Sequence, residues 1–188
     1  MKRRLGTAIG MEAALGFYRR TTADLLRRVG RDRRWRMVLV VTPDAFVRRG
    51  RFWPGGLARE PQGFGDLGAR MARALRRHAG QGPALLVGSD IPALGARHVW
   101  QAFRALGDHE LVFGPATDGG YWLVGTRRKP DRDLFAGVRW SSPHALADTL
   151  ANVRIGKRVA MLAPLSDVDD GASYRRFVAT SGARSGAA

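Results

Sequence analysis

The sequence predicts a three-layer α/β fold with a mostly parallel sheet between helices. Strand-like and helix-like segments alternate along the 188 residues, an order typical of parallel strands joined by helical crossovers. The strand-like segments are short, uninterrupted apolar runs, as expected for strands buried on both faces. A chain of this length can bury a sizeable core. We expect a single domain over residues 1–180 and a flexible, small-residue tail over 181–188.

Five segments are expected to be helices. The first carries Phe17, Leu25 and Val29 at helical spacing, and the second follows a glycine-rich stretch and directs Met71 and Leu75 inward. In chain order the expected helices cover residues 11–29, 66–78, 96–106, 143–152 and 170–179.

Five apolar runs are expected to be strands. The first is β-branched and stops at the turn signal Thr42-Pro43-Asp44. Residues 48–63 are rich in glycine and proline and are expected to form a loop. In chain order the expected strands cover residues 37–41, 84–88, 110–113, 121–125 and 158–162.

The charge balance is strongly basic. The chain has 32 Lys plus Arg against 16 Asp plus Glu, a net charge of +16, and only three of the basic residues are lysines. Such a balance attracts nucleic acid, anionic membranes or phosphorylated substrates. The arginines are scattered, which favours a solvated basic surface. The densest group, residues 27–36, has the single aromatic Trp35, unlike the aromatic-lined sheet of an RNA-binding module. We do not expect nucleic acid as a partner.

The composition also excludes several classes of site. No cysteine is present, so disulfides, thiolate nucleophiles and cysteine-based metal sites are excluded. No apolar run approaches the length of a membrane span. The basic residues 1–4 are not followed by the apolar region of a signal peptide. We therefore expect a cytoplasmic protein.

Asp90 follows the apolar run 84–87, within Gly88-Ser89-Asp90-Ile91-Pro92. Ligands of open α/β sheets bind just beyond the carboxyl ends of the strands. A hard cation such as Mg²⁺ uses one or two carboxylates and completes its shell with water and substrate phosphates. This preference suits a lone aspartate at a strand end. The alternative is a turn residue.

Asp118 begins Asp118-Gly119-Gly120-Tyr121, between two apolar runs. Paired glycines after an aspartate allow a tight turn with positive φ, so the segment could simply connect a hairpin. A ligand-binding loop is favoured instead by the neighbouring residues, which are small before the turn and aromatic at 121–122 after it.

Three acids lie between the last strand and the last helix, in Ser166-Asp167-Val168-Asp169-Asp170. Asp169 or Asp170 could cap that helix. Asp167 and Asp169 alternate along an extended segment, so only one of them can face a given site.

The glycine-rich start of the second expected helix, residues 62–71, exposes backbone N–H groups that suit phosphate binding. Asp66 could cap this helix, and Arg70 lies one turn into it. The four histidines show no ligand spacing.

In this order, these stretches resemble a bacterial family of GT-A-fold glycosyltransferase-like proteins, often labelled radical-SAM/selenodomain-associated transferases. That family is distantly related to phospholactate guanylyltransferase and molybdenum cofactor guanylyltransferase. The matching stretches are residues 2–5, 62–71, 88–92, 114–121, 134–135, 140–141 and 165–170.

The resemblance implies a nucleotide-diphospho-sugar transferase (GT-A) fold that binds Mg²⁺ or Mn²⁺ between its aspartates and the phosphates of the donor. Asp90 takes the role of first ligand, with Asp169 as the second and Asp167 as its alternative. The Asp-Gly-Gly loop lines the acceptor side, so Asp118 is expected to position or deprotonate the acceptor, beside Gly119, Gly120 and Tyr121. The residues expected to bind the nucleotide or donor are Lys2, Arg4, Gly65, Asp66, Arg70 and Ser89.

The chain departs from the family at its start. Family members have an apolar strand and a glycine-rich turn before the segment that begins here at Lys2. That strand is expected between strands 37–41 and 84–88, and without it each unpaired buried group costs roughly 1–3 kcal/mol. We expect that the start is misassigned, with a GTG valine codon read as Met1; a stop codon immediately upstream would refute this.

The expected function is metal-dependent transfer of a glycosyl group from a nucleotide sugar to an unknown acceptor. One alternative is a nucleotidyltransferase that uses an NTP and releases pyrophosphate. Another is a non-catalytic basic domain that binds nucleic acid or a partner protein.

Overall fold

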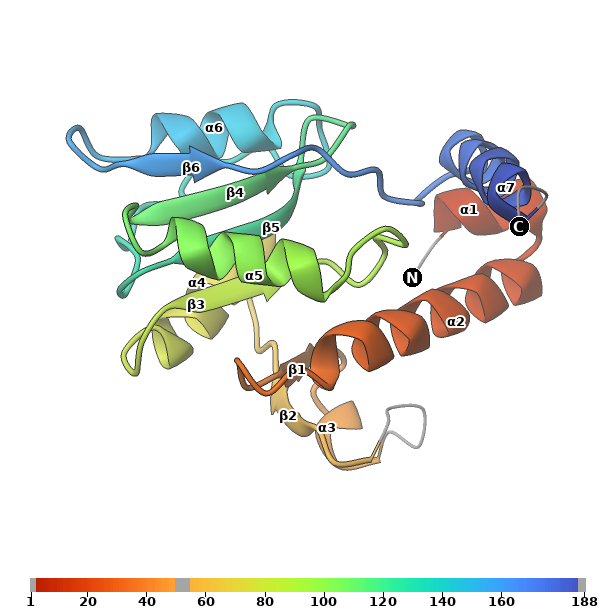
Figure 1. Ribbon diagram of the computed structural model, residues 1–188, viewed down its shortest axis with the longest axis horizontal. Coiled ribbons are helices and arrows are strands. Elements are labelled where there is room, and N and C mark those ends of the chain that lie inside the picture. Colours follow the sequence, from red (N-terminus) through yellow and green to blue (C-terminus); the bar gives the residue numbers. More distant parts are fainter. Residues whose placement is uncertain (1–2, 50–54, 186–188) are drawn as a thin grey trace.

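The structure is a computed structural model that describes residues 3–49 and 55–185 (Figure 1). The helices are α1 (Arg3–Ile9), α2 (Met11–Gly30), α3 (Phe46–Arg49), α4 (Leu67–His78), α5 (Ala96–Ala105), α6 (Ala145–Ala151) and α7 (Gly171–Ser185). The strands are β1 (Val38–Val41), β2 (Ala58–Pro61), β3 (Ala84–Val87), β4 (Leu111–Pro115), β5 (Tyr121–Thr126) and β6 (Val159–Met161).

The larger sheet has the strand order β3-β5-β4-β6. Strand β5 runs antiparallel to both of its neighbours, whereas β4 and β6 are parallel. The other strands therefore share one direction, so β3, β4 and β6 bring their carboxyl ends to one edge. The two central strands, β4 and β5, are almost entirely buried.

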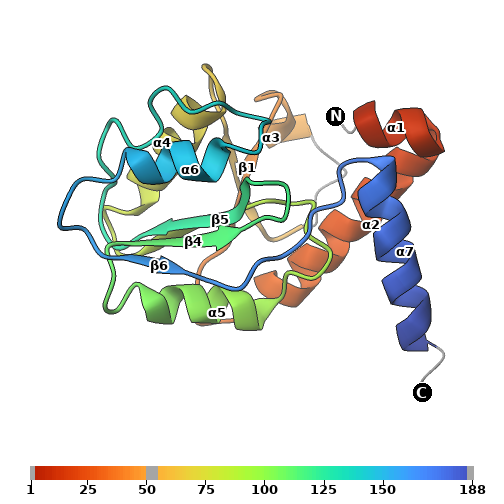
Figure 2. The same cartoon turned by 90° about the horizontal axis from the view of Figure 1, so that it is seen from above.

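Helices cover both faces of this sheet, as the sequence predicts (Figure 2). Helix α5 lies on one face with the C-terminal half of α2, and α4 and α6 lie on the other. Alternate residues of β4 face opposite layers: Val112 joins the core with Leu25 of α2, whereas Phe113 joins the core with Leu75 of α4. This alternation follows from the two-residue period of a strand.

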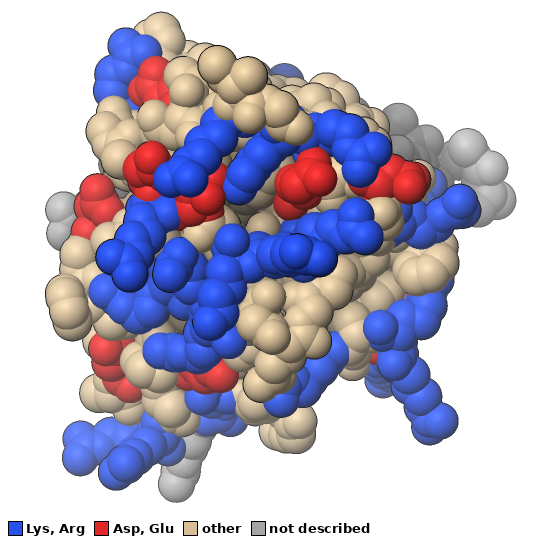
Figure 3. Space-filling view, turned by 90° about the vertical axis from the view of Figure 1, so that its left-hand side faces the viewer, with Lys and Arg blue, Asp and Glu red and all other residues tan. Residues whose placement is uncertain are grey.

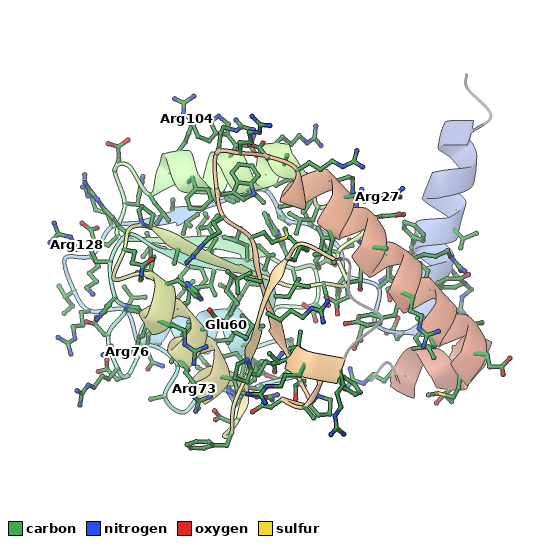
Figure 4. All side chains as sticks on the ribbon, turned by 90° about the horizontal axis from the view of Figure 1, so that it is seen from below. Arg27, Glu60, Arg73, Arg76, Arg104 and Arg128 are labelled. Carbon is green, nitrogen blue, oxygen red and sulfur yellow. The ribbon has the colours of Figure 1, made fainter. Side chains whose placement is uncertain are left out.

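A second, two-stranded sheet consists of β1 and β2 in parallel. The prediction that residues 48–63 form only a loop is wrong, because β2 and part of α3 lie within it. Strand β2 contains Arg59 and Glu60, so it has no apolar run to reveal it. Glu60 lies beside α4, where its carboxylate accepts hydrogen bonds from Arg77 at 2.7 Å and pairs with His78 at 3.1 Å (Figure 4). Pairing with β1 and α4 therefore defines this strand.

Strands β1 and β3 belong to different sheets and do not pair with each other. Both strands are apolar throughout, yet three of the four residues in each are only partly buried. Among the described residues no strand pairs with the free edge of β1 or of β3. The family resemblance places its additional strand at this position.

Three helical segments form a group beside the sheet (Figure 1). Leu5 of α1, Phe17 of α2 and Val168 form its buried core, with Tyr174 and Phe177 of α7 packed against them. Helix α1 was not predicted, because residues 2–5 were expected to belong to a nucleotide loop. Helix α7 extends to Ser185, six residues beyond the expected end at residue 179, and so enters the segment predicted to be a flexible tail.

Candidate carboxylate site at the strand ends

The chain after β6 continues alongside β4 and then crosses to the end of β3. The Leu162 and Leu165 amides donate to the carbonyls of Phe113 and Pro115, at 2.8 and 3.1 Å. Leu165 also forms an isolated parallel bridge with Ala116. The Val168 amide then donates to the Asp90 carbonyl at 3.1 Å. This path brings the acidic segment to the edge where β3 and β4 end.

Asp167 lies among the other acids of this edge. The pKa of Asp167 is raised to about 6, mainly by burial and then by the nearby carboxylates of Asp118, Asp90 and, least, Asp169. A carboxyl whose pKa is raised by several negative neighbours marks a place where a cation would be stabilised. The structure therefore gathers the acids of three separate sequence motifs.

Asp90 is not the N-cap of α5, the helix that follows it, because it lies too far before the start of that helix. Helix α5 begins at Ala96, and its N-cap is Gly95, whose amide donates to Nδ1 of His98 at 3.1 Å. The neighbouring Ser89 has its Oγ 3.3 Å from the Tyr18 hydroxyl of α2. Helix α2, which none of the sequence motifs included, therefore contacts the segment that carries Asp90. The only sequence signal for Tyr18 was a tyrosine, an aromatic residue with a hydroxyl group, on the inward face of that helix.

Asp118 lies in the connection between β4 and β5, which is a hairpin. The Gly120 amide donates to Asp118 Oδ1 at 2.9 Å. Gly119 has φ +87°, and a Cβ there would lie 2.2 Å from the Pro143 carbonyl oxygen. The Leu146 amide donates to the Gly119 carbonyl at 3.1 Å. The hairpin interpretation is therefore correct, and this tight turn also presents Asp118 to the acidic cluster.

Tyr121 turns away from the acids toward the core beneath α6. Its ring contacts Phe113 edge-on, with centroids 5.4 Å apart, and its hydroxyl lies 3.4 Å from Thr149 Oγ1. Burial raises the pKa of this hydroxyl, with the Thr149 contact opposing the shift. A role for Tyr121 in the acceptor loop stays a prediction, and its side chain supports the loop from below.

The glycine-rich segment before α4 is held by its own residues. Asp66 caps α4 as predicted, because its Oδ1 accepts a hydrogen bond from the Ala69 amide at 2.8 Å. Arg70 donates to the Asp66 carbonyl at 3.1 Å and to Gln62 Oε1 at 3.0 Å. Gly65 has φ +97°, a conformation that favours glycine. Binding of donor phosphates by Gly65, Asp66 and Arg70 stays a prediction.

The remaining residues predicted for the site lie near the last helix or near the start of the chain. Asp170 caps α7, since its Oδ1 accepts from the Ser173 amide at 2.8 Å. The Asp169 amide donates a hydrogen bond to Ser173 Oγ at 3.1 Å. Arg4 lies exposed on α1. Lys2 falls outside the described residues, so its nucleotide-binding role stays a prediction.

The donor set suits a hard divalent cation. The clustered groups are all carboxylates, the ligands that Mg²⁺ and Mn²⁺ prefer. Within the described residues, no group of three or more histidine, aspartate or glutamate side chains is placed so that it could hold a metal ion. One or two protein ligands, completed by water and substrate phosphates, are the arrangement that these residues fit.

The sequence also matches a known protein family. Residues 25–142, more than half of the chain, match the model of a family described as uncharacterized proteins conserved in bacteria, DUF2064. The chain belongs to this family. The match covers β1 to β5, and with them Asp90 and Asp118. No curated protein matches the sequence.

Solved structures with the same fold include a candidate nucleotide-diphospho-sugar transferase from Desulfovibrio desulfuricans G20. It is 29% identical, with a TM-score of 0.81, over 90% of this chain and 76% of that one. Rv0371c from Mycobacterium tuberculosis H37Rv matches with a TM-score of 0.51 at 20% identity, over 85% of this chain and 83% of that one. Its complex with manganese matches with a TM-score of 0.50 at 19% identity, over 85% and 84%.

These matches confirm the predicted nucleotide-diphospho-sugar transferase type of fold for the DUF2064 chain. No helix in the described part of the chain is both long and apolar enough to cross a bilayer.

Proposed function

We propose that this DUF2064 protein is a divalent-cation-dependent glycosyltransferase that uses a nucleotide-sugar donor. The observation that carries the proposal is the convergence of Asp90, Asp118 and Asp167 at the carboxyl ends of β3 and β4. The likeness to the Desulfovibrio protein supports a nucleotide sugar as donor. The manganese complex of Rv0371c supports a divalent cation at this kind of fold.

In this proposal Asp90 holds the cation together with Asp169 or, as the alternative, with Asp167, whose pKa is raised by the charges of Asp118 and Asp90. Mn²⁺ or Mg²⁺, when bound, neutralises the diphosphate leaving group. Asp118 accepts the proton of the acceptor hydroxyl. Its carboxylate is already oriented by the Gly120 amide, which leaves its position defined before the acceptor binds.

Three sets of residues complete the proposal. Gly119 and Gly120 shape the acceptor loop. Ser89, fastened to Tyr18, keeps Asp90 at the end of its strand. The segment from Gly65 to Arg70 receives donor phosphates, as do Lys2 and Arg4. The finer resemblance to the selenodomain-associated transferases and to the two guanylyltransferases stays a prediction.

The test is thermal unfolding of the full chain with UDP-, GDP- and dTDP-sugars and with NTPs, each with and without Mn²⁺ or Mg²⁺. A ligand at 100 times its Kd adds about 2.7 kcal/mol to the free energy of unfolding. We expect a shift that needs both the metal and one nucleotide sugar, and that is lost in Asp90→Asn. Asp108→Asn is the matched control, because Asp108 is exposed in the loop after α5.

Product analysis then separates the two reaction classes. A glycosyltransferase releases a nucleoside diphosphate, whereas the nucleotidyltransferase alternative releases pyrophosphate from an NTP. A stabilising shift with an NTP alone, together with pyrophosphate release, would replace the glycosyltransferase proposal. No shift with any nucleotide from a folded sample would refute both.

A further inference from the structure

The end of the molecule farthest from the carboxylate site carries a dense basic surface. Strands β3, β4 and β6 begin at this end, β5 ends there, and Figure 3 shows Lys and Arg side chains spread across it. Figure 4 places Arg76, Arg104 and Arg128 at the same end of the molecule. The members of this basic end are Arg76, Arg104, Arg127, Arg128, Lys129, Arg132, Arg154, Lys157 and Arg158.

Backbone contacts hold these residues side by side although they come from distant parts of the sequence. The Arg127 amide donates to the Glu110 carbonyl at 2.9 Å, and the Arg158 amide donates to Glu110 Oε2 at 2.8 Å. Arg76 donates to the Pro130 carbonyl at 2.7 Å. The basic end is therefore built on the ordered starts and ends of strands.

Two acids at this end, Asp131 and Glu110, already have basic partners. Asp131 pairs with Lys157 at 2.6 Å and with Arg154 at 3.5 Å. Glu110 lies 3.9 Å from the Arg158 guanidinium. Within residues 3–49 and 55–185, the adjacent and exposed Arg127, Arg128 and Lys129 form no ion pair within 4.0 Å, although the charge of Arg127 helps to lower the pKa of Glu110. The surface thus keeps an uncompensated positive charge.

An exposed isoleucine lies between two of these basic residues in the chain. Ile155 is fully exposed, between Arg154 and Lys157, in the loop that leads into β6. A single exposed aliphatic side chain is ordinary on a protein surface. An exposed aliphatic side chain flanked by cations suits the interface of an anionic bilayer, where phosphates face the charges and acyl chains receive the apolar group. Nucleic acid would satisfy the cations but offers no apolar layer for Ile155.

We propose that the basic end docks on an anionic phospholipid bilayer, with Arg127, Arg128 and Lys129 against the headgroup phosphates and Ile155 in the interface. This orientation directs the edge that carries Asp90 and Asp118 away from the bilayer. The proposal is independent of the transferase proposal, because it shares no residue with the carboxylate site.

The test is co-sedimentation of the full chain with vesicles of phosphatidylcholine alone or mixed with phosphatidylglycerol. Each positive charge at an anionic surface contributes about a fivefold factor to partitioning. We expect binding only to the mixed vesicles, and a loss of more than about a hundredfold in R127E/R128E/K129E. The matched control is R20E/R28E/R31E, which makes the same charge change on exposed residues of α2 and its C-cap. We expect it to lose less than about tenfold.

A second variant isolates the apolar contact. Ile155→Asp is expected to weaken binding to mixed vesicles beyond the effect of its single charge, whereas Ile155→Leu retains it. Circular dichroism of each variant shows whether the fold is kept.

Three results would overturn the proposal. The first is equal binding to vesicles with and without phosphatidylglycerol, and the second is an equal loss of vesicle binding in the two triple variants. The third is that the protein binds duplex DNA, with Ile155→Asp binding it equally well, but does not bind mixed vesicles. The last result would assign the basic end to nucleic acid.

Discussion

The amide of Val168 donates a hydrogen bond of 3.1 Å to the carbonyl of Asp90. This contact joins the segment after β6 to the turn after β3, although β5 and β4 lie between these two strands in the sheet. Its consequence is that Asp167 and Asp90, far apart in the chain, share one electrostatic environment.

Replacement of Asp167 by asparagine should stabilise the metal-free protein near neutral pH. The native pKa of about 6 lies above the ordinary 3.8, so the folded chain binds this proton more tightly than the unfolded chain. The free energy of unfolding of the wild type should therefore fall as pH rises from about 4 to about 6. Partial exposure of the site limits the effect to the order of 1 kcal/mol.

Urea unfolding at several pH values between those limits measures this effect. Asp167→Asn should flatten the dependence, whereas the control Asp133→Asn, an exposed acid outside the cluster, should leave it in place. An unchanged pH dependence in Asp167→Asn would mean that Asp167 does not carry the shifted pKa.

Binding of Mn²⁺ should weaken as pH falls through about 6. A cation requires the deprotonated carboxylates, so it competes with the proton that Asp167 holds in the metal-free state. Isothermal titration with Mn²⁺ at pH values on both sides of 6 measures the loss. Asp90→Asn should reduce the affinity at every pH, whereas Asp170→Asn should change it little, because Asp170 caps α7. Equal losses in both variants would contradict the assignment.

Gly119→Ala should destabilise the protein strongly. Alanine at φ +87° is strained, and its Cβ would meet the Pro143 carbonyl at 2.2 Å, so the hairpin and the segment before α6 would have to separate. We expect a cost of about 2–4 kcal/mol in the free energy of unfolding. Gly137→Ala is the control, with φ +65° but nothing within 4 Å of its Cβ. If the two variants lose the same stability, the contact with Pro143 has no part in the effect.

Asp66→Ala should cost about 1 kcal/mol in stability, because the N-cap bond to the Ala69 amide is lost. Asp66→Asn should recover most of it, since the amide oxygen can accept the same bond. Thermal unfolding of both variants measures the difference. A donor-binding role for Asp66 would appear separately, as weaker nucleotide binding in the asparagine variant despite its recovered stability.

Local sequence signals determined much of the fold. Helix α4 was predicted with its Asp66 cap, because a cap and its helix lie within one turn of the chain. The end of β3 before Asp90 and the hairpin at Asp118 were also visible, since apolar runs and glycine pairs act over a few residues. By contrast, β2 was missed, because its polar residues become a strand only by pairing with β1.

The sequence by itself determined that aspartates stand at strand ends, and that the chain has an α/β pattern with a basic surface. Only the tertiary structure decided that Asp167 comes within electrostatic range of Asp118 and Asp90, and that Tyr121 turns into the core. The physical reason is that a strand sends alternate side chains to opposite faces, so a side chain's direction depends on the register with a distant partner. For Asp167 that register is set by Ala116 and Leu165 and by the bond from Val168 to Asp90.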